Sequence, residues 1–179
     1  MTAPLWSVPV SIDDVTEAGL HLHLVADEAT RAAVARAAGL RDLPRLEASF
    51  DVARKGSDSL KVVGDVSATV GQDCVVTLEP VENEVHESID LVFAQSGGGT
   101  MADDEGQATL QFQDAELPES MPDGVVDLGA LATEYLLLGI DPYPRKPDAI
   151  FENPGKDEPR ENPFAVLSAL KKPAGGDKS

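Results

Sequence analysis

Three histidines carry the side chains in this sequence that are best suited to metal chemistry. His21 and His23 stand two residues apart in the segment LHLHLV, so on a β-strand their rings share one face. With His86 as a third nitrogen ligand, they could hold a catalytic zinc or iron ion. Such a site also needs partners that orient the ligands, and the neighbouring sequence offers none. A solvent-exposed strand face explains the pair, and we expect no metal, no cofactor and no catalytic residue.

Cys74 is the only cysteine in the 179 residues, which excludes an intramolecular disulfide and a cysteine-ligated metal cluster. A chain of this kind suits a reducing compartment. The first residues, MTAPLWSVPVSIDD, lack the basic start and the unbroken apolar core of a secretory signal. The longest apolar segment is shorter than the roughly 20 residues that cross a bilayer. We therefore expect a cytoplasmic protein that does not enter membranes.

Charge is distributed unevenly along the chain. The formal net charge is −18, and the stretch 62–144 contains 17 Asp and Glu but no Lys or Arg. Such a segment repels a phosphate backbone, whereas it attracts a basic partner. We therefore expect an acidic surface that binds a basic protein, with these candidate residues: Glu79, Glu82, Glu84, Glu87, Glu134 and Asp141.

An alternative is direct RNA binding through the basic part of the front half. Seven Lys and Arg fall between 31 and 61, and the tail from 145 onward carries another seven. The candidate contacts in the front half are Arg31, Arg36, Arg41 and Arg45. No aromatic residues are interleaved with them to stack on bases, so a solvated helix face and strand edge is the simpler interpretation.

One helix, expected over 127–139, organises the fold. Asp127 suits the N-cap, and Leu131, Tyr135 and Leu138 follow at helical spacing, so one broad face should be buried. Glu134 falls on the opposite, solvent-exposed stripe. Gly139 is placed to end the helix in the left-handed conformation. A shorter alanine-rich helix is expected over 27–38, ended by Gly39.

Strands are predicted from two-residue alternation. Residues 45–54 and 60–70 alternate in polarity almost without interruption and should pair as a hairpin. Further strands are expected over 20–24, 74–78 and 84–93, with a short edge strand around Trp6 to Val10. Short connections favour antiparallel pairing. The predicted fold is α+β, an antiparallel β-sheet meander covered on its apolar face by the 127–139 helix.

Two segments lack this patterning. A flexible acidic insert is expected at about 95–123, within a single domain spanning 1–150. Residues 151–179 read as a mobile, proline-rich tail that contains a short amphipathic helix at 163–172. We expect fast amide exchange over 96–105 and 153–161, since neither can bury enough apolar surface to offset chain entropy.

Four segments together resemble the YceD family of bacterial and plastid large ribosomal RNA subunit accumulation proteins. They are VSATVGQDCVVTLEPVENEV, ESIDLVF, VDLGALATEYLLLGIDPYPRKP and NPFAVLSALKK. Many relatives carry two cysteines in the first segment, and here Gly71 takes the place of the first, leaving only Cys74. A metal role for that pair is therefore not open to this chain.

The resemblance implies a part in the synthesis, processing or stability of large-subunit ribosomal RNA, and it implies no catalytic residue. Joined to the charge distribution, it leads us to expect a non-enzymatic ribosome-biogenesis factor. Its partner would be a basic protein, such as a ribosomal protein, with only indirect association with ribosomal RNA. The RNA-binding module and a metal-dependent enzyme built on the histidines are the alternatives.

Overall fold

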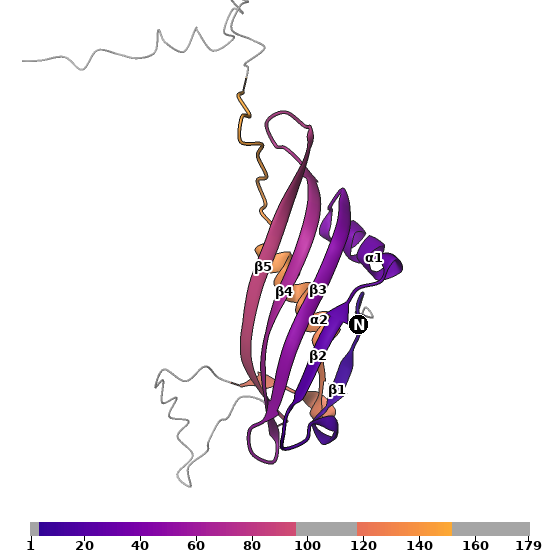
Figure 1. The fold of residues 1–179 in the computed structure, drawn as a ribbon, viewed down its shortest axis with the longest axis vertical. Helices are drawn as coiled ribbons and strands as arrows, with labels where there is room; N and C mark the ends of the chain where they lie inside the picture. The colour runs from indigo at the N-terminus through magenta and orange to yellow at the C-terminus, as the bar shows by residue number, and fades with distance from the viewer. Residues whose placement is uncertain (1–3, 96–117, 152–179) are drawn as a thin grey trace, which may run out of the picture. The chain divides into compact units, whose positions relative to one another are not determined.

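Two long hairpins form the main sheet of the protein (Figure 1). The computed structural model describes residues 4–95 and 118–151. The chain divides into two units, Met1–Ala149 and Ile150–Ser179, and every described helix and strand belongs to the first. The predicted mobile segments 96–105 and 153–161 and the predicted helix 163–172 lie outside the described residues.

Strands β2 (Leu20–Val25), β3 (Asp42–Arg54), β4 (Ser59–Asp73) and β5 (Pro80–Ala94) are antiparallel neighbours in chain order. The predicted hairpin is confirmed, because Arg45 pairs with Thr69 and Arg54 with Leu60. Alternation explains this register, since a shift by one residue would turn every apolar side chain of the strand toward solvent.

A fifth strand, β6 (Glu119–Ser120), pairs with the end of β5 in parallel, so the sheet is mixed rather than wholly an antiparallel meander. The fold class, α+β, is as predicted. The last residues of the insert expected at about 95–123 belong to the fold, because β6 is part of the sheet and Met121 is fully buried.

A separate two-stranded sheet joins the two ends of the described chain. Its strands are β1 (Pro9–Ser11) and β7 (Val125–Asp127), which are antiparallel. Asp127 then caps the helix that follows, so this small sheet fixes where the helix begins.

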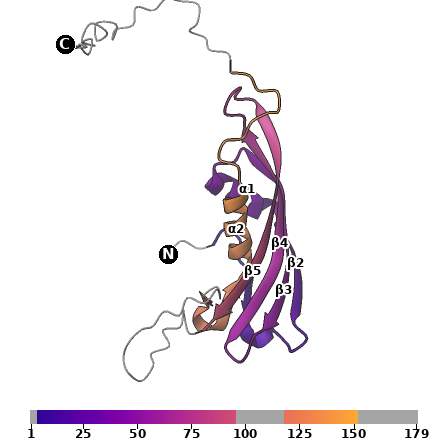
Figure 2. The ribbon, with the colours of Figure 1, turned by 90° about the vertical axis from the view of Figure 1, so that its left-hand side faces the viewer.

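Both helices lie on one face of the main sheet, and the other face is open (Figure 2). The first helix, α1 (Glu28–Ala38), has Asp27 as N-cap and Gly39 in the left-handed conformation at its end, as predicted. The second, α2 (Leu128–Gly139), packs on β4 and β5. Between the helices and the sheet lies a core whose largest fully buried side chains include Phe50, Leu46, Leu60, Leu128 and Leu136.

The end of α2 differs from the prediction in two ways. Gly139 does not adopt a left-handed conformation, and Ile140 continues in extended conformation. Glycine at this position lets the end of α2 approach β5 closely, because a Cβ would lie 2.6 Å from Cγ1 of Val85 and 2.5 Å from Oε1 of Glu87. Leu138, expected on the buried stripe, is 73% exposed.

The strand predicted over 74–78 is wrong. Residues between β4 and β5 form a turn, in which the Cys74 amide donates to the Glu79 carbonyl and the Leu78 amide donates to the Cys74 carbonyl, both at 2.8 Å. Leu78 has a positive φ of 59°, a conformation that costs a branched residue backbone strain. A run of apolar letters therefore marks the tip of a hairpin rather than a further strand.

Candidate protein-binding surface

The open face of the main sheet is built from every second residue of its strands. On β5 these residues are Glu82, Glu84, His86, Ser88 and Asp90, and all of them are exposed. The intervening residues Val85 and Ile89 are buried against the helices. Alternation thus places three carboxylates of one strand on one solvent-facing surface.

Two of the three carboxylates on the open face of β5 have cationic neighbours across the sheet. Oε2 of Glu84 lies 2.6 Å from Nη2 of Arg45, and its other oxygen accepts from the Thr69 hydroxyl at 2.6 Å. The Thr69 hydroxyl and the Arg45 guanidinium together lower the pKa of Glu84. Lys61 pairs with Asp90 at 3.2 Å. Within the described residues, Glu82 has no such partner.

Glu87 is one of the predicted protein-binding residues, but it lies on the opposite face of the sheet. Odd-numbered residues of β5 face the helices, and Glu87 is half-buried there beside Gly139. Sequence reasoning also missed Asp90, although its separation of six residues from Glu84 gives it the same face. The open face of β5 therefore carries Glu82 and Glu84 of the predicted residues together with Asp90, but not Glu87.

Glu79 and Asp141 both lie near the tip of the β4–β5 hairpin. Oε2 of Glu79 accepts from Nζ of Lys146 at 2.8 Å, and this contact lowers the pKa of Glu79. The Asp141 carboxylate accepts from the Tyr143 amide at 2.8 Å, and its carbonyl accepts from the Gln72 amide side chain at 2.9 Å. Both candidates thus hold the chain after α2 against the hairpin.

Glu134 is exposed on α2, as predicted. It lines a hollow of about 220 Å³ together with Ala130 of the same helix, Phe93 of β5 and Ser120 of β6. The hollow lies where the helix passes the end of the pairing between β5 and β6. Glu134 consequently borders the edge of the sheet on its helix side.

Cys74 is fully buried at the start of the hairpin turn. Hydrogen bonds from the Thr77 hydroxyl and from the backbone amides of Lys146 and Thr77 lower the pKa of its thiol to about 6. A Cβ at position 71 would collide with the carboxylate of Asp42. The space that a side chain at 71 would occupy is therefore filled by the neighbouring strand.

The histidines do not meet. His21 and His23 lie on the open face of β2, where their Nδ1 atoms contact Asp51 at 2.8 Å and Ser49 at 3.1 Å. His86 is on β5, three strands away, which corresponds to about 14 Å at ordinary strand spacing. No group of three His, Cys, Asp or Glu residues in the described ranges could hold a metal ion.

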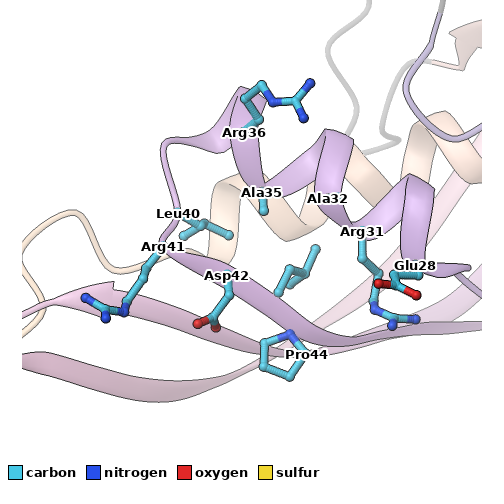
Figure 3. Close-up of a pocket in the computed structure, with 10 residues that line it drawn as sticks. Glu28, Arg31, Ala32, Ala35, Arg36, Leu40, Arg41, Asp42 and Pro44 are labelled. Atoms are coloured by element: carbon cyan, nitrogen blue, oxygen red, sulfur yellow. The ribbon is translucent and has the colours of Figure 1, made fainter.

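Three of the four arginines proposed for RNA binding surround one hollow of about 450 Å³ between α1 and β3 (Figure 3). They are Arg31, Arg36 and Arg41, and the lining includes Glu28 and Asp42. Arg31 donates to the Ala26 carbonyl at 2.7 Å and Arg41 to Asp73 at 3.1 Å, while Arg36 points away from the hollow.

The fourth arginine, Arg45, lies on the open face of the sheet and is held by Glu84. The four arginines do not form one patch, and two of the three around the hollow already have protein acceptors.

No helix among residues 4–95 and 118–151 is long and apolar enough to cross a membrane. Comparison with known proteins finds no match among curated proteins and none among solved structures. A family model described as large ribosomal RNA subunit accumulation protein YceD matches residues 62–171, which is most of the chain and includes β5 and α2. The family name implies a role in accumulation of the RNA of the large ribosomal subunit. The chain belongs to the YceD family.

Proposed function

We propose that this protein supports accumulation of large-subunit ribosomal RNA by binding a basic protein, without catalysing a reaction. Family membership supplies the biological setting, and the exposed carboxylates of β5 carry the proposal. Its partner would be a basic protein of the large subunit, held away from incorrect RNA contacts in the cytoplasm. Association with ribosomal RNA would then be indirect.

The charge of the sheet favours a protein partner over RNA. On β5 itself the open face carries three carboxylates and no Lys or Arg, so a phosphate backbone laid along this strand would be repelled. Each exposed pairing contributes at most about 1 kcal/mol, so affinity must come from several acting together. Binding of this kind weakens as salt rises, since the Debye length is about 10 Å at 0.1 M salt and attraction between exposed charges farther apart than this is largely screened.

The test uses the full chain and large-subunit ribosomal proteins freed of RNA. Glu82→Lys should weaken binding most on the open face, because Glu82, unlike Glu84 and Asp90, forms no ion pair with another residue that the structure describes, and Glu134→Lys reports on the helix side. Glu17→Lys is the matched control, since it makes the same charge change at an exposed turn residue. Loss of binding in the control equal to that in Glu82→Lys would show that net charge alone, and not this surface, is recognised.

A second candidate function is direct RNA binding at the α1–β3 hollow. The observation that favours it is the gathering of Arg31, Arg36 and Arg41 around one site. In that case naked large-subunit RNA would bind tightly, and changing Arg31 and Arg36 to alanine would abolish binding while Glu82→Lys would not. The acidic-surface proposal requires the reverse ranking.

A further inference from the structure

Among the residues that the structure describes, the outer edge of β5 has no partner strand over most of its length. β5 spans Pro80–Ala94, yet β6 pairs with it only at Phe93 and Ala94. The other edge strand, β2, has six residues. Figure 1 shows β5 bordering the sheet on the side opposite β2.

The direction of the backbone groups follows from the hydrogen bonds at the end of β5. The Ala94 carbonyl accepts from the Met121 amide at 2.9 Å, so Ala94 points its backbone groups to the β6 side. Gln95 donates to Asp58 in the turn before β4, so the next residue points the other way. Pairing between β4 and β5 runs without a register shift, and alternation therefore extends to the start of the strand.

Even-numbered residues of β5 consequently aim both amide and carbonyl outward. Over residues 82–92, within the described part of the chain, these outward groups have no hydrogen-bond partner. Their side chains are those of the open face, so the free backbone edge and the carboxylates of Glu82, Glu84 and Asp90 belong to the same residues. The residues that offer backbone donors and acceptors along this edge thus also carry its negative charge.

We propose that the free edge of β5 binds an extended basic segment of the partner protein, which adds a strand to the sheet. This inference rests on the proposed function and states how the basic partner is held. In strand addition, main-chain hydrogen bonds give affinity and alternate side chains give specificity. Facing side chains on adjacent strands lie about 5 Å apart, so lysines or arginines at alternate positions would reach the β5 carboxylates.

The helix side of the edge suits the other side chains of such a segment. Leu91 is half-buried there, and the hollow lined by Phe93, Ser120 and Glu134 lies beside the point where pairing with β6 begins. An apolar residue, or the aliphatic stem of a lysine reaching Glu134, fits this position. The segment therefore alternates basic residues with apolar or long-stemmed ones.

A second copy of this chain is a poorer occupant of the edge. Pairing β5 with β5 would bring Glu82, Glu84 and Asp90 of one molecule beside the carboxylates of the other. Like charges facing each other across strands are destabilising, and charged residues on edge strands prevent such self-pairing. The same charges that exclude a copy attract a basic strand.

The experiment measures amide hydrogen exchange and binding with the full-length protein. The probe is a synthetic peptide that alternates lysine with valine. Its matched control has the same sequence, but alternate backbone amides, those that would donate to β5, are N-methylated. Methylation removes these donors and keeps every charge. The probe should protect the amides of His86 and Ser88 from exchange. For each hydrogen bond that it loses, the methylated peptide should bind up to about tenfold more weakly, which corresponds to the upper end of the usual free-energy contribution of a hydrogen bond.

On the protein, Ser88→Pro removes one outward donor without changing charge, and proline is tolerated at strand edges. Ser88→Ala is its matched control. We expect the peptide to bind Ser88→Pro several-fold more weakly than Ser88→Ala. Should Ser88→Pro fail to fold, the methylated peptide still decides the question.

The outcomes separate the two proposals. Equal binding of methylated and unmethylated peptides would overturn strand addition while leaving the acidic surface intact. Methylation-sensitive binding of the peptide, with no binding of ribosomal proteins, would support the edge and overturn the proposed function. Slow exchange at His86 and Ser88 in the free protein would mean that the edge is already covered, by the chain itself or by a second copy, and would overturn the inference.

Discussion

Replacing Asp127 with alanine should destabilise the protein by disconnecting α2 from the N-terminal segment. Oδ1 of Asp127 accepts from the amides of Gly129 at 3.1 Å, Ala130 at 3.0 Å and Val8 at 2.8 Å. Oδ2 accepts from the Ser7 hydroxyl at 2.6 Å. One side chain therefore caps the helix and anchors the segment that leads into β1.

The magnitude follows from these contacts. Loss of an N-cap costs about 1 kcal/mol, and leaving the part-buried Val8 amide without its acceptor costs about another 1 kcal/mol. Asp127→Ala should thus lower the free energy of unfolding by about 2 kcal/mol, which is roughly 8 °C in Tm for a unit of this size. Urea titration followed by far-ultraviolet circular dichroism measures the difference.

Asp127→Asn is the matched control for the charge. Its amide oxygen can still accept from the three backbone amides, so it should lose about 0.5–1 kcal/mol, mainly the attraction between the carboxylate and the helix dipole. The reasoning is refuted if Asp127→Ala costs less than about 0.5 kcal/mol, or if the asparagine variant is as unstable as the alanine variant.

Three further predictions concern other parts of the molecule. Acidification should close the stability gap between wild type and Asp127→Asn. Although burial opposes the shift, hydrogen bonds from Ser7 and the backbone hold the pKa of Asp127 below the ordinary carboxyl value, so the gap persists above the ordinary pKa and is lost as pH falls through the lowered pKa. A gap that widens in acid would contradict this. Gly64→Ala should cost about 3 kcal/mol in urea denaturation, because the new Cβ would meet the Ser49 carbonyl and lie 2.6 Å from the Phe50 ring; a cost under 1 kcal/mol would show that the strands separate easily. Cys74 should react slowly with a thiol reagent in the native state and quickly in urea, since burial denies access despite a pKa of about 6; fast native labelling would mean that the hairpin turn opens.

Much of the fold could be predicted because its local signals are strong. Alternation in 45–54 and 60–70 predicted the hairpin and the face on which each side chain lies, and Asp127 and Asp27 marked where the two helices begin. These signals depend on neighbours within a few residues, which is why sequence alone was sufficient. The family resemblance was confirmed by the family model, which matches residues 62–171.

The errors arose where distant residues decide the structure. The turn at 74–79 contains the apolar letters of a strand, but Cys74 and Val75 bond to the chain around Pro144 and Lys146 instead of to another strand. Leu138 is exposed because it lies on the side of α2 that faces away from the sheet, whereas the next residue, Gly139, packs closely against Val85.

Charge balance on the surface was equally hidden from the sequence. A count along the chain shows no Lys or Arg near Glu84, yet the fold brings Arg45 against it from 39 residues away. Lys61 reaches Asp90 in the same manner. The face on which Glu87 lies follows from the predicted strand 84–93 itself, because residues three positions apart, such as Glu84 and Glu87, lie on opposite faces of a strand.

Pairing of β1 with β7 has a consequence for the order in which the protein can fold during synthesis. β2 to β5 are neighbours both in the sheet and in strand order along the chain, so they can associate as soon as each leaves the ribosome. The Val8 amide, in contrast, must wait for Asp127, which is made 119 residues later. Until then β1 has no β7 to pair with, and Trp6, which is 8% exposed in the finished fold, lacks part of its cover. Translation thus leaves the hydrophobic segment around Trp6 available to chaperones until α2 emerges and the small sheet forms.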